Sequence, residues 1–566
     1  MEINRPGKKL RGALSGGKWI ISTLIITLVI LVPLFIVILE FFYPSSAIWQ
    51  HFISSLIPGY LKNSLLLLAG AGICTFILGT GTAWLVSMYS FPGRKFFAWA
   101  LVLPITIPSW ILGFTWAGML DYTSPLYTFL RDRYAVETGA YLFFDLLSPE
   151  GAIVIFSLSL YPYVYLICRA FFMNQSAAML ETAASMGRST FESFFRIALP
   201  MARPAIAAGV TLVLMEVLND YGLVRYFGVD TFTTGIFSAW FAFGDRSTAL
   251  RLAGWLVVIV IGIILAEKLQ RGRARFDILG SSYRPLRRRD PIKPVAVMAT
   301  AFCSVPFLLG FLFPFITLIL WTIKTASIVV DPSFFRLAAN SFLLAASAAI
   351  TGMAVAFLIL FSIRVSRSKA AYLLSKTATV GYAIPGAVVA IGILIPLLMV
   401  DDWLRYGQIL LTGSSGRFML SGSVFALIYA YLVRFLAIGY NSLEAGYERI
   451  SMSIDESAAS LGSSKGRTLR ELHLPLLRGT LLGGGLLIFV DVLKELPLTL
   501  ILRPFNFDTL AIRAFEYASD ERVAQSAPAA LIIIITAMVP AFMMNRILTG
   551  RKNIKNIPGS GLTKKT

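Results

Sequence analysis

The feature that most constrains this chain is a series of apolar runs of 18 residues or more, repeated along its whole length. A helix needs roughly 20 apolar residues to cross a bilayer, so runs of this length predict membrane spans. Inside lipid the backbone must satisfy its own hydrogen bonds, which leaves helices or a closed barrel. The runs lack the alternation of barrel strands, and 57% of all residues are hydrophobic. We therefore predict an all-α, polytopic membrane protein.

Twelve spans are predicted, in two groups of six. The first group covers about 19–42, 63–89, 96–120, 151–174, 202–220 and 249–268. The second group covers about 295–324, 340–362, 371–400, 421–444, 476–495 and 525–547. The predicted domains are a basic N-terminal segment (1–18), a first transmembrane unit (19–268), a basic linker (269–294), a second transmembrane unit (295–547) and a basic tail (548–566).

The net charge of +20 would suit a nucleic-acid-binding protein, but the position of the charges indicates another cause. With the N-terminus inside and twelve spans, most Lys and Arg residues fall on one side, together with the linker and the tail. This is the positive-inside pattern, so we predict a multi-pass protein in a lipid bilayer, with cytoplasmic N- and C-termini and no nucleic-acid partner. The three Cys and two His residues lack metal-site spacing, and no metal site is assigned.

A twenty-residue segment occurs twice between the spans, from Glu181 to Pro200 and from Glu456 to Pro475. Both copies keep Glu, Ala-Ala, Gly and a final Leu-Pro at the same spacing. An acid at the start of a helical turn suits the helix dipole, and Gly allows a stop or a sharp turn. Each Leu-Pro is predicted to break the chain and begin a fresh helix. The prediction is a compact helix-turn-helix with an alanine face that enters a groove on another protein; the alternative is a tight turn at the membrane surface that was merely duplicated.

The repeat extends beyond this segment. At an offset of 275 residues Glu216 corresponds to Asp491 and Asp220 to Glu495, and further upstream the offset becomes 277, where Ile107-Pro108 matches Ile384-Pro385. An even number of spans places both units the same way up. We therefore predict a parallel repeat with a substrate path between the units.

A cluster with two acidic residues follows each copy of the segment: Glu216 and Asp220, with the amide Asn219 between them, and again Asp491 and Glu495. Ionisable groups at membrane depth are costly and usually face a cavity or a partner. A spacing of four predicts that the two acids of each copy share one helix face. One interpretation is a carboxylate-lined entrance for a cationic substrate. The other is structural, with these acids paired to Lys494, Arg225, Arg503 or Arg513; both remain open.

Residues Gly12 to Lys18 fit the start of a phosphate-binding loop, but Trp19 stands where that loop needs Ser or Thr. We interpret this stretch as a flexible basic flank. No cofactor is predicted for this chain, and ATP with its magnesium would be bound by a separate subunit. The aromatic cluster of Tyr161, Tyr163 and Tyr165 is interpreted as packing or interface residues.

The duplicated segment resembles the EAA loop of ABC importer permeases, which docks on an ATP-hydrolysing subunit. The two six-span units resemble the fused permease of ferric-iron ABC importers, of the type I importer fold. The stretches 494–510, 516–521, 219–222 and 232–237 also look close to that iron branch. By this resemblance, the residues that couple to the ATPase are Glu181, Ala183, Ala184, Gly187, Leu199, Pro200, Glu456, Ala458, Ala459, Gly462, Leu474 and Pro475.

The resemblance implies a transport subunit, not an enzyme, in the bacterial inner membrane. Its expected partners are two copies of an ABC ATPase and a periplasmic substrate-binding protein. The implied function is the import of ferric iron by ATP-driven alternating access. Thiamine, polyamine and phosphonate importers share this architecture, so those substrates stay open. An ion-coupled secondary transporter is the alternative from another class, but it has no need of two docking segments.

Overall fold

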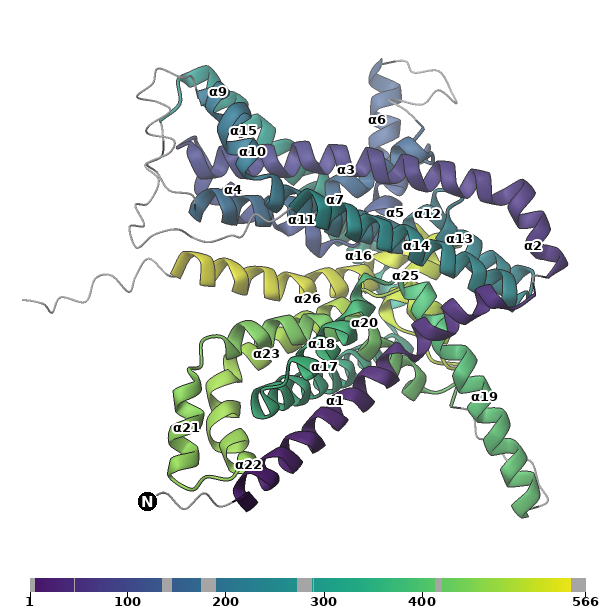
Figure 1. Cartoon of the computed structure of the whole chain (residues 1–566). Coiled ribbons are helices and arrows are strands. Elements are labelled where there is room, and N and C mark those ends of the chain that lie inside the picture. The colour runs from purple at the N-terminus through teal and green to yellow at the C-terminus, as the bar shows by residue number, and fades with distance from the viewer. Residues whose placement is uncertain are drawn as a thin grey trace, which may run out of the picture.

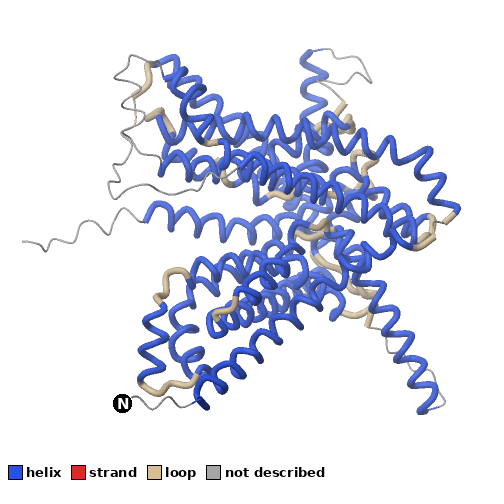
Figure 2. Tube along the Cα trace, in the orientation of Figure 1, coloured by secondary structure: helices blue, strands red, loops and turns tan. Residues whose placement is uncertain are grey.

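The computed structural model describes residues 6–44, 46–134, 145–174, 190–271, 288, 290–412 and 420–550. Within these ranges the chain is helical and contains no strand, as Figure 2 shows. Ten of the described helices are long and apolar enough to cross a membrane, or twelve if each of two bent pairs is one span. The predicted all-α fold with about twelve spans is therefore confirmed.

The first unit contains helices α1 to α14 and short 3₁₀ or π-helical segments labelled η. Its elements are α1 (Pro6–Leu39), η1 (Glu40–Phe42), α2 (Ala47–His51), η2 (Phe52–Leu56), α3 (Ile57–Met88), α4 (Arg94–Ala100), η3 (Leu103–Thr106), α5 (Ser109–Met119), α6 (Pro125–Tyr134), α7 (Pro149–Asn174), α9 (Thr190–Ser193), η4 (Phe194–Ala198), α10 (Leu199–Met201), α11 (Arg203–Asn219), α12 (Gly222–Tyr226), α13 (Phe232–Phe237), η5 (Ser238–Ala242) and α14 (Arg246–Arg271). Residues Gly12 to Lys18, which we expected as a flexible flank, lie in the first part of α1.

The second unit repeats this order. Its elements are α15 (Lys293–Phe307), η6 (Leu308–Leu312), α16 (Phe313–Val329), α17 (Pro332–Ser366), α18 (Lys369–Ala378), η7 (Thr379–Ala383), α19 (Gly386–Thr412), α20 (Val424–Tyr447), α21 (Met452–Ser460), α22 (Lys465–Thr468), η8 (Leu469–His473), α23 (Leu474–Leu493), α24 (Pro497–Leu502), α25 (Leu510–Ser519) and α26 (Val523–Gly550).

Two predicted spans, 96–120 and 371–400, are each broken into two helices. In the first unit α4–η3 and α5 meet at an angle of 93°. The breaks fall at Ile107 and Ile384, which are extended and stand directly before Pro108 and Pro385. A residue before proline is pushed out of the helical region by the proline ring, which explains why both copies break at the same place.

The Leu-Pro pairs match the prediction in part: α10 and α23 begin at Leu199 and Leu474 with the proline in the first turn, and in the first copy the chain bends by 65° between α10 and α11. In each copy a π-helical segment, η4 or η8, runs directly into the helix that contains the proline. The backbone N–H of Leu199 bonds to the carbonyl of Phe194, and that of Leu474 bonds to Leu469, five residues back. A π-bulge absorbs the hydrogen bond that proline cannot make, so the chain remains helical into Pro200 and Pro475.

The first helix of each unit packs on the other unit. Figure 1 shows α1 beside the second-unit helices α17, α18 and α19, which it also contacts. The Thr23 hydroxyl donates to Ser362 Oγ over 2.7 Å. In return, the indole N–H of Trp116 on α5 donates to the carbonyl of Leu309 in η6 over 3.0 Å. The domain boundaries 19–268 and 295–547 remain predictions, and the packing of the helices crosses them.

Candidate functional site

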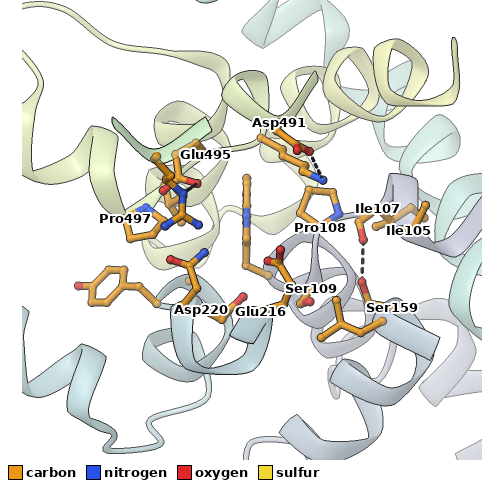
Figure 3. A pocket seen from close by; sticks show the side chains of 18 of the residues that line it. Ile105, Ile107, Pro108, Ser109, Ser159, Glu216, Asp220, Asp491, Glu495 and Pro497 are labelled. Atoms are coloured by element: carbon orange, nitrogen blue, oxygen red, sulfur yellow. Dashed lines mark hydrogen bonds and ion pairs between the residues drawn. The ribbon is translucent and has the colours of Figure 1, made fainter. Parts of the chain in front are cut away.

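A polar cavity of about 80 Å³ lies where the two units meet. Its walls come from both: Figure 3 shows Glu216 and Asp220 of the first unit facing Asp491 and Glu495 of the second. Other lining side chains are Ser159, Tyr163, Asn219, Tyr382, Arg434 and Lys494. All five residues predicted for the substrate path therefore line one cavity, although their role in transport stays a prediction.

The spacing predicted that the two acids of each copy share one helix face. In the structure they do not. Helix α11 ends at Asn219, and Asp220 is its C-cap in an extended conformation. Helix α23 ends at Leu493, so Glu495 lies two residues beyond it. The chain turns at these points into α12 and α24, and this turn brings the second acid of each pair into the cavity.

Two of the four acids are paired with cations. Asp491 lies 2.7 Å from Lys494 Nζ, as one interpretation predicted. Glu495 lies 3.4 Å from the guanidinium of Arg434, and the side chains of both are less than a tenth exposed. The predicted partners Arg503 and Arg513 instead hold Asp508. Sequence reasoning missed Arg434, although a single arginine inside the apolar span 424–447 is the kind of residue that marks a buried site.

The other two acids, Glu216 and Asp220, are not within ion-pair distance of a cation among the described residues. In the described part of the chain neither Glu216 nor Asp220 forms an ion pair. Tyr163 lies within hydrogen-bonding reach of Glu216, so this tyrosine lines the cavity and is not only a packing residue. Asp220 Oδ1 accepts the N–H of Leu223 over 2.7 Å, which begins α12. The cavity thus holds four carboxylates and two cations, an arrangement that favours a positively charged occupant.

The units are in direct contact at this cavity. Asn219 Oδ1 of the first unit accepts the N–H of Gly386 at the start of α19 over 2.7 Å. A Cβ at Gly386 would lie 2.6 Å from Glu495 Oε1, closer than atoms can approach. Glycine is therefore required for the ion pair of Glu495 and Arg434 to sit against the end of α19.

The second copy of the duplicated segment lies at one end of the molecule, where Figure 1 shows α21 and α22. Gly462 has a φ of 81°, the left-handed region that favours glycine. The N–H of Ser463 bonds to Ala458 O and that of Gly462 to Ala459 O, which is the Schellman end of a helix. The predicted stop of the helix at Gly462 is confirmed. In the first copy Glu181, Ala183, Ala184 and Gly187 lie outside the described residues, while Leu199 and Pro200 belong to α10.

The alanine face was expected to be flat and exposed, but in the structure it is not. Ala458 is buried and lines a groove of about 480 Å³ between α21 and η8, while Glu456 and Ala459 are exposed. Leu461 at the rim is 89% exposed. Leu474 and Pro475 are also exposed on the surface of α23. The segment therefore presents a shallow groove with an exposed leucine, a surface suited to a protein partner.

A buried network anchors α21 to the membrane helices. Asp455 accepts hydrogen bonds from Arg364 Nε at the end of α17 and lies 2.7 Å from His473 Nε2 in η8. Arg364 also donates to the carbonyls of Tyr447, Ile450 and Ser451. His473 is 1% exposed, and the side chains of Arg364 and Asp455 are 10% and 20% exposed. No local sequence pattern predicts this network, because its members lie on elements that only the fold brings together.

We expect Asp455→Ala to loosen α21, because it leaves Arg364 and His473 without their shared acceptor. Removing one partner of such a buried group costs about 1–3 kcal/mol or more. The measurement is amide hydrogen exchange over residues 451–462, which should become faster. The control is Glu471→Ala, which breaks only an exposed pair with Arg467 and is expected to cost about 0–1 kcal/mol. Equal exchange in both variants would show that the network does not hold α21.

Comparison with known proteins adds the family context. Residues 75–271 match the family model of the binding-protein-dependent transport system inner membrane component. The chain is 27% identical to the Fe(3+)-transport system permease protein FbpB 2 of Haemophilus influenzae, over 86% of this chain and 89% of that protein. It is 22% identical to the ferric transport system permease protein FbpB of Actinobacillus pleuropneumoniae, over 84% of this chain and 71% of that protein.

A shorter match is to a permease whose name gives a different substrate. The sulfate transport system permease protein CysT of Salmonella typhimurium is 26% identical over 36% of this chain and 72% of that protein. The charged cavity, the spans and the family match point to the same class of protein. Residues 75–271 are similar to the inner membrane component of binding-protein-dependent transport systems, and over most of its length the chain is similar to ferric transport permeases.

Proposed function

We propose that the chain is the transmembrane permease subunit of an ATP-driven importer and moves ferric iron from the periplasm to the cytoplasm. The observation that carries this proposal is the acid-rich cavity between α11 and α23. These are the spans that directly follow the two copies of the duplicated segment. Movement of the second segment is therefore transmitted along α23 to the cavity, and movement of the first segment passes through the 65° bend between α10 and α11.

The cavity requires the two units to move. Its volume of about 80 Å³ has room for only a few water molecules, since each takes about 30 Å³ in the liquid. A hydrated or chelated ferric ion needs more space, so the units must separate around Glu216, Asp220, Asp491 and Glu495 to admit it. Alternating access supplies this separation, first toward the periplasm and then toward the cytoplasm.

ATP hydrolysis on two separate subunits drives this movement. One ATPase docks at the groove beside Ala458 and Leu461, and the second docks at the Glu181–Pro200 segment. A partner can shift the equilibrium between two conformations only if it binds one of them better. The network of Asp455, Arg364 and His473 supports such coupling, because it prevents α21 from moving independently of α17.

The charges support a cation over an anion. Sulfate and phosphonate would face four acidic side chains, two of which form no ion pair among the described residues. Thiamine and polyamines are cations and meet the same charge requirement, and the similarity to a ferric permease over 86% of the chain supports iron over them. A secondary transporter would carry substrate without any ATPase, which the following experiment also tests.

We expect vesicles that contain this chain with its ATPase subunits and binding protein to take up radiolabelled ferric iron only when ATP is supplied. Unlabelled ferric iron should compete, whereas sulfate, thiamine and spermidine should not. A second test uses the variant Glu216→Gln, which removes an acidic group from the cavity without breaking an ion pair. It should lower uptake about tenfold or more. Uptake without ATP, or competition by thiamine or spermidine instead of iron, would contradict the proposal.

A further inference from the structure

Three arginines gather at the end of the first unit where α3 ends and α4 begins. Arg169 on α7 is 8% exposed, and its Nη1 donates to the carbonyl of Ala98. Arg94, at the start of α4, donates to the carbonyl of Val86 over 3.2 Å. The guanidinium of Arg94 lies within electrostatic range of those of Arg169 and Arg288. Three positive charges therefore share a partly buried site.

This cluster has no negative partner. Among the described residues no Asp or Glu forms an ion pair with Arg94, Arg169 or Arg288. The Nε–H groups of Arg169 and Arg288 are buried and have no acceptor. Burying a cation without a counter-charge is costly, and like charges at short range add to that cost. An anion at the site would remove both penalties.

At the corresponding place in the second unit, an acid and a base neutralise each other's charge. Tyr165 and Arg169 correspond to Tyr440 and Glu444 at the offset of 275, and Ala98 corresponds to Ser375 at 277. Tyr165 OH donates to Ala98 O, and Tyr440 OH pairs in the same way with Ser375 Oγ over 2.9 Å. In the second unit, however, Glu444 binds Lys376 over 2.8 Å. The first unit keeps the tyrosine but replaces the acid with an arginine.

We propose that Arg94, Arg169 and Arg288 form a binding site for a phosphate group, carried by a phospholipid headgroup or by a free phosphate compound. Guanidinium groups match the oxygens of phosphate in pairs, and three of them can surround one tetrahedral group. The site lies at the ends of membrane helices, the level at which basic pockets bind anionic headgroups. Because Arg288 belongs to the linker between the units, an occupied site also ties that linker to α4 and α7.

The test uses the full chain, purified in detergent and stripped of lipid, in two arms. In the first arm, native mass spectrometry follows the binding of phosphatidylglycerol, with phosphatidylcholine as the zwitterionic comparison. In the second arm, equilibrium dialysis follows radiolabelled inorganic phosphate. Each arm compares the wild type with Arg169→Gln and with Lys376→Gln, the matched control that removes one cation from the corresponding place in the second unit.

We expect Arg169→Gln to weaken binding about tenfold or more, since it removes a paired contact to the phosphate, and Lys376→Gln to leave it unchanged. Binding of phosphatidylglycerol alone assigns the site to a lipid headgroup, and binding of inorganic phosphate assigns it to a free compound. Arg94→Gln gives the same comparison if Arg169→Gln does not fold. Equal binding by wild type and the folded arginine variant, or equal losses in that variant and Lys376→Gln, would overturn the proposal.

Discussion

Substrate uptake is expected to fall about tenfold when Gly462 is replaced by valine, while the chain still inserts into the membrane. Gly462 has a φ of 81°, and a side chain there costs about 1–2 kcal/mol or more for a β-branched residue. That cost falls on the turn between α21 and α22, so the docking groove must distort or α21 must unwind at its end. A loss of about 1–2 kcal/mol in the free energy of docking weakens binding of the ATPase about 5–30-fold.

The measurement is ATP-driven uptake in vesicles, together with the amount of ATPase that copurifies with the chain. The control is Gly466→Val, on the same surface but within α22, where a Cβ meets no atom within 4 Å and φ is not positive. This control should transport normally. The corresponding change at Gly187 tests the first copy. Normal uptake by the Gly462 variant with full ATPase coupling would show that this segment is not the docking site.

Glu495→Gln is expected to destabilise the protein by about 3–5 kcal/mol, because it leaves the buried charge of Arg434 unpaired. Removing both charges, in Arg434→Met with Glu495→Leu, is expected to restore most of the stability without restoring transport. Adding Asp220→Asn to Glu495→Gln should lower substrate flux more than it lowers assembly of the complex. The physical reason is that Asp220 has no cation partner to lose, yet it faces the cavity.

Thermal unfolding of the purified chain measures the loss of stability, and flux in reconstituted vesicles measures the loss of transport. Asp220→Asn alone is the control for stability, because asparagine keeps the oxygen that accepts the Leu223 N–H. It should unfold like the wild type and transport less. If the double variant Arg434→Met, Glu495→Leu transported normally, the ion pair would have no part in the substrate path.

The docking segment illustrates how far the local sequence reaches. The stop of α21 at Gly462 was predictable, because it depends only on the conformational freedom of one glycine. New helices begin at the two Leu-Pro pairs as predicted, but the π-helical turns η4 and η8 that lead into them were not predicted. Whether a proline breaks or continues a helix depends on the hydrogen bonds that neighbouring turns can rearrange, and the residue type does not specify this.

For the cavity, the sequence predicted the lining residues but not their ion-pair partners. All five predicted path residues line it, because ionisable groups in apolar spans are costly to expose to lipid and usually face a cavity or a partner. Their partners were mostly wrong: Arg434 was missed, and Arg503 and Arg513 pair elsewhere. Glu495 meets Arg434 only because α20 packs against α23 and α24, a contact between residues far apart in the chain.

The sequence by itself determined the all-α fold with about twelve spans, the duplicated segment and the stop of α21 at Gly462, because hydrophobic length and glycine conformation act locally. Only the tertiary structure decided that α1 packs on the second unit, that Asp455 joins Arg364 to His473, and that Arg169 has no acid where Glu444 has Lys376. These outcomes depend on contacts between distant segments. Their free energies are set by how whole helices pack together, so no local pattern records them.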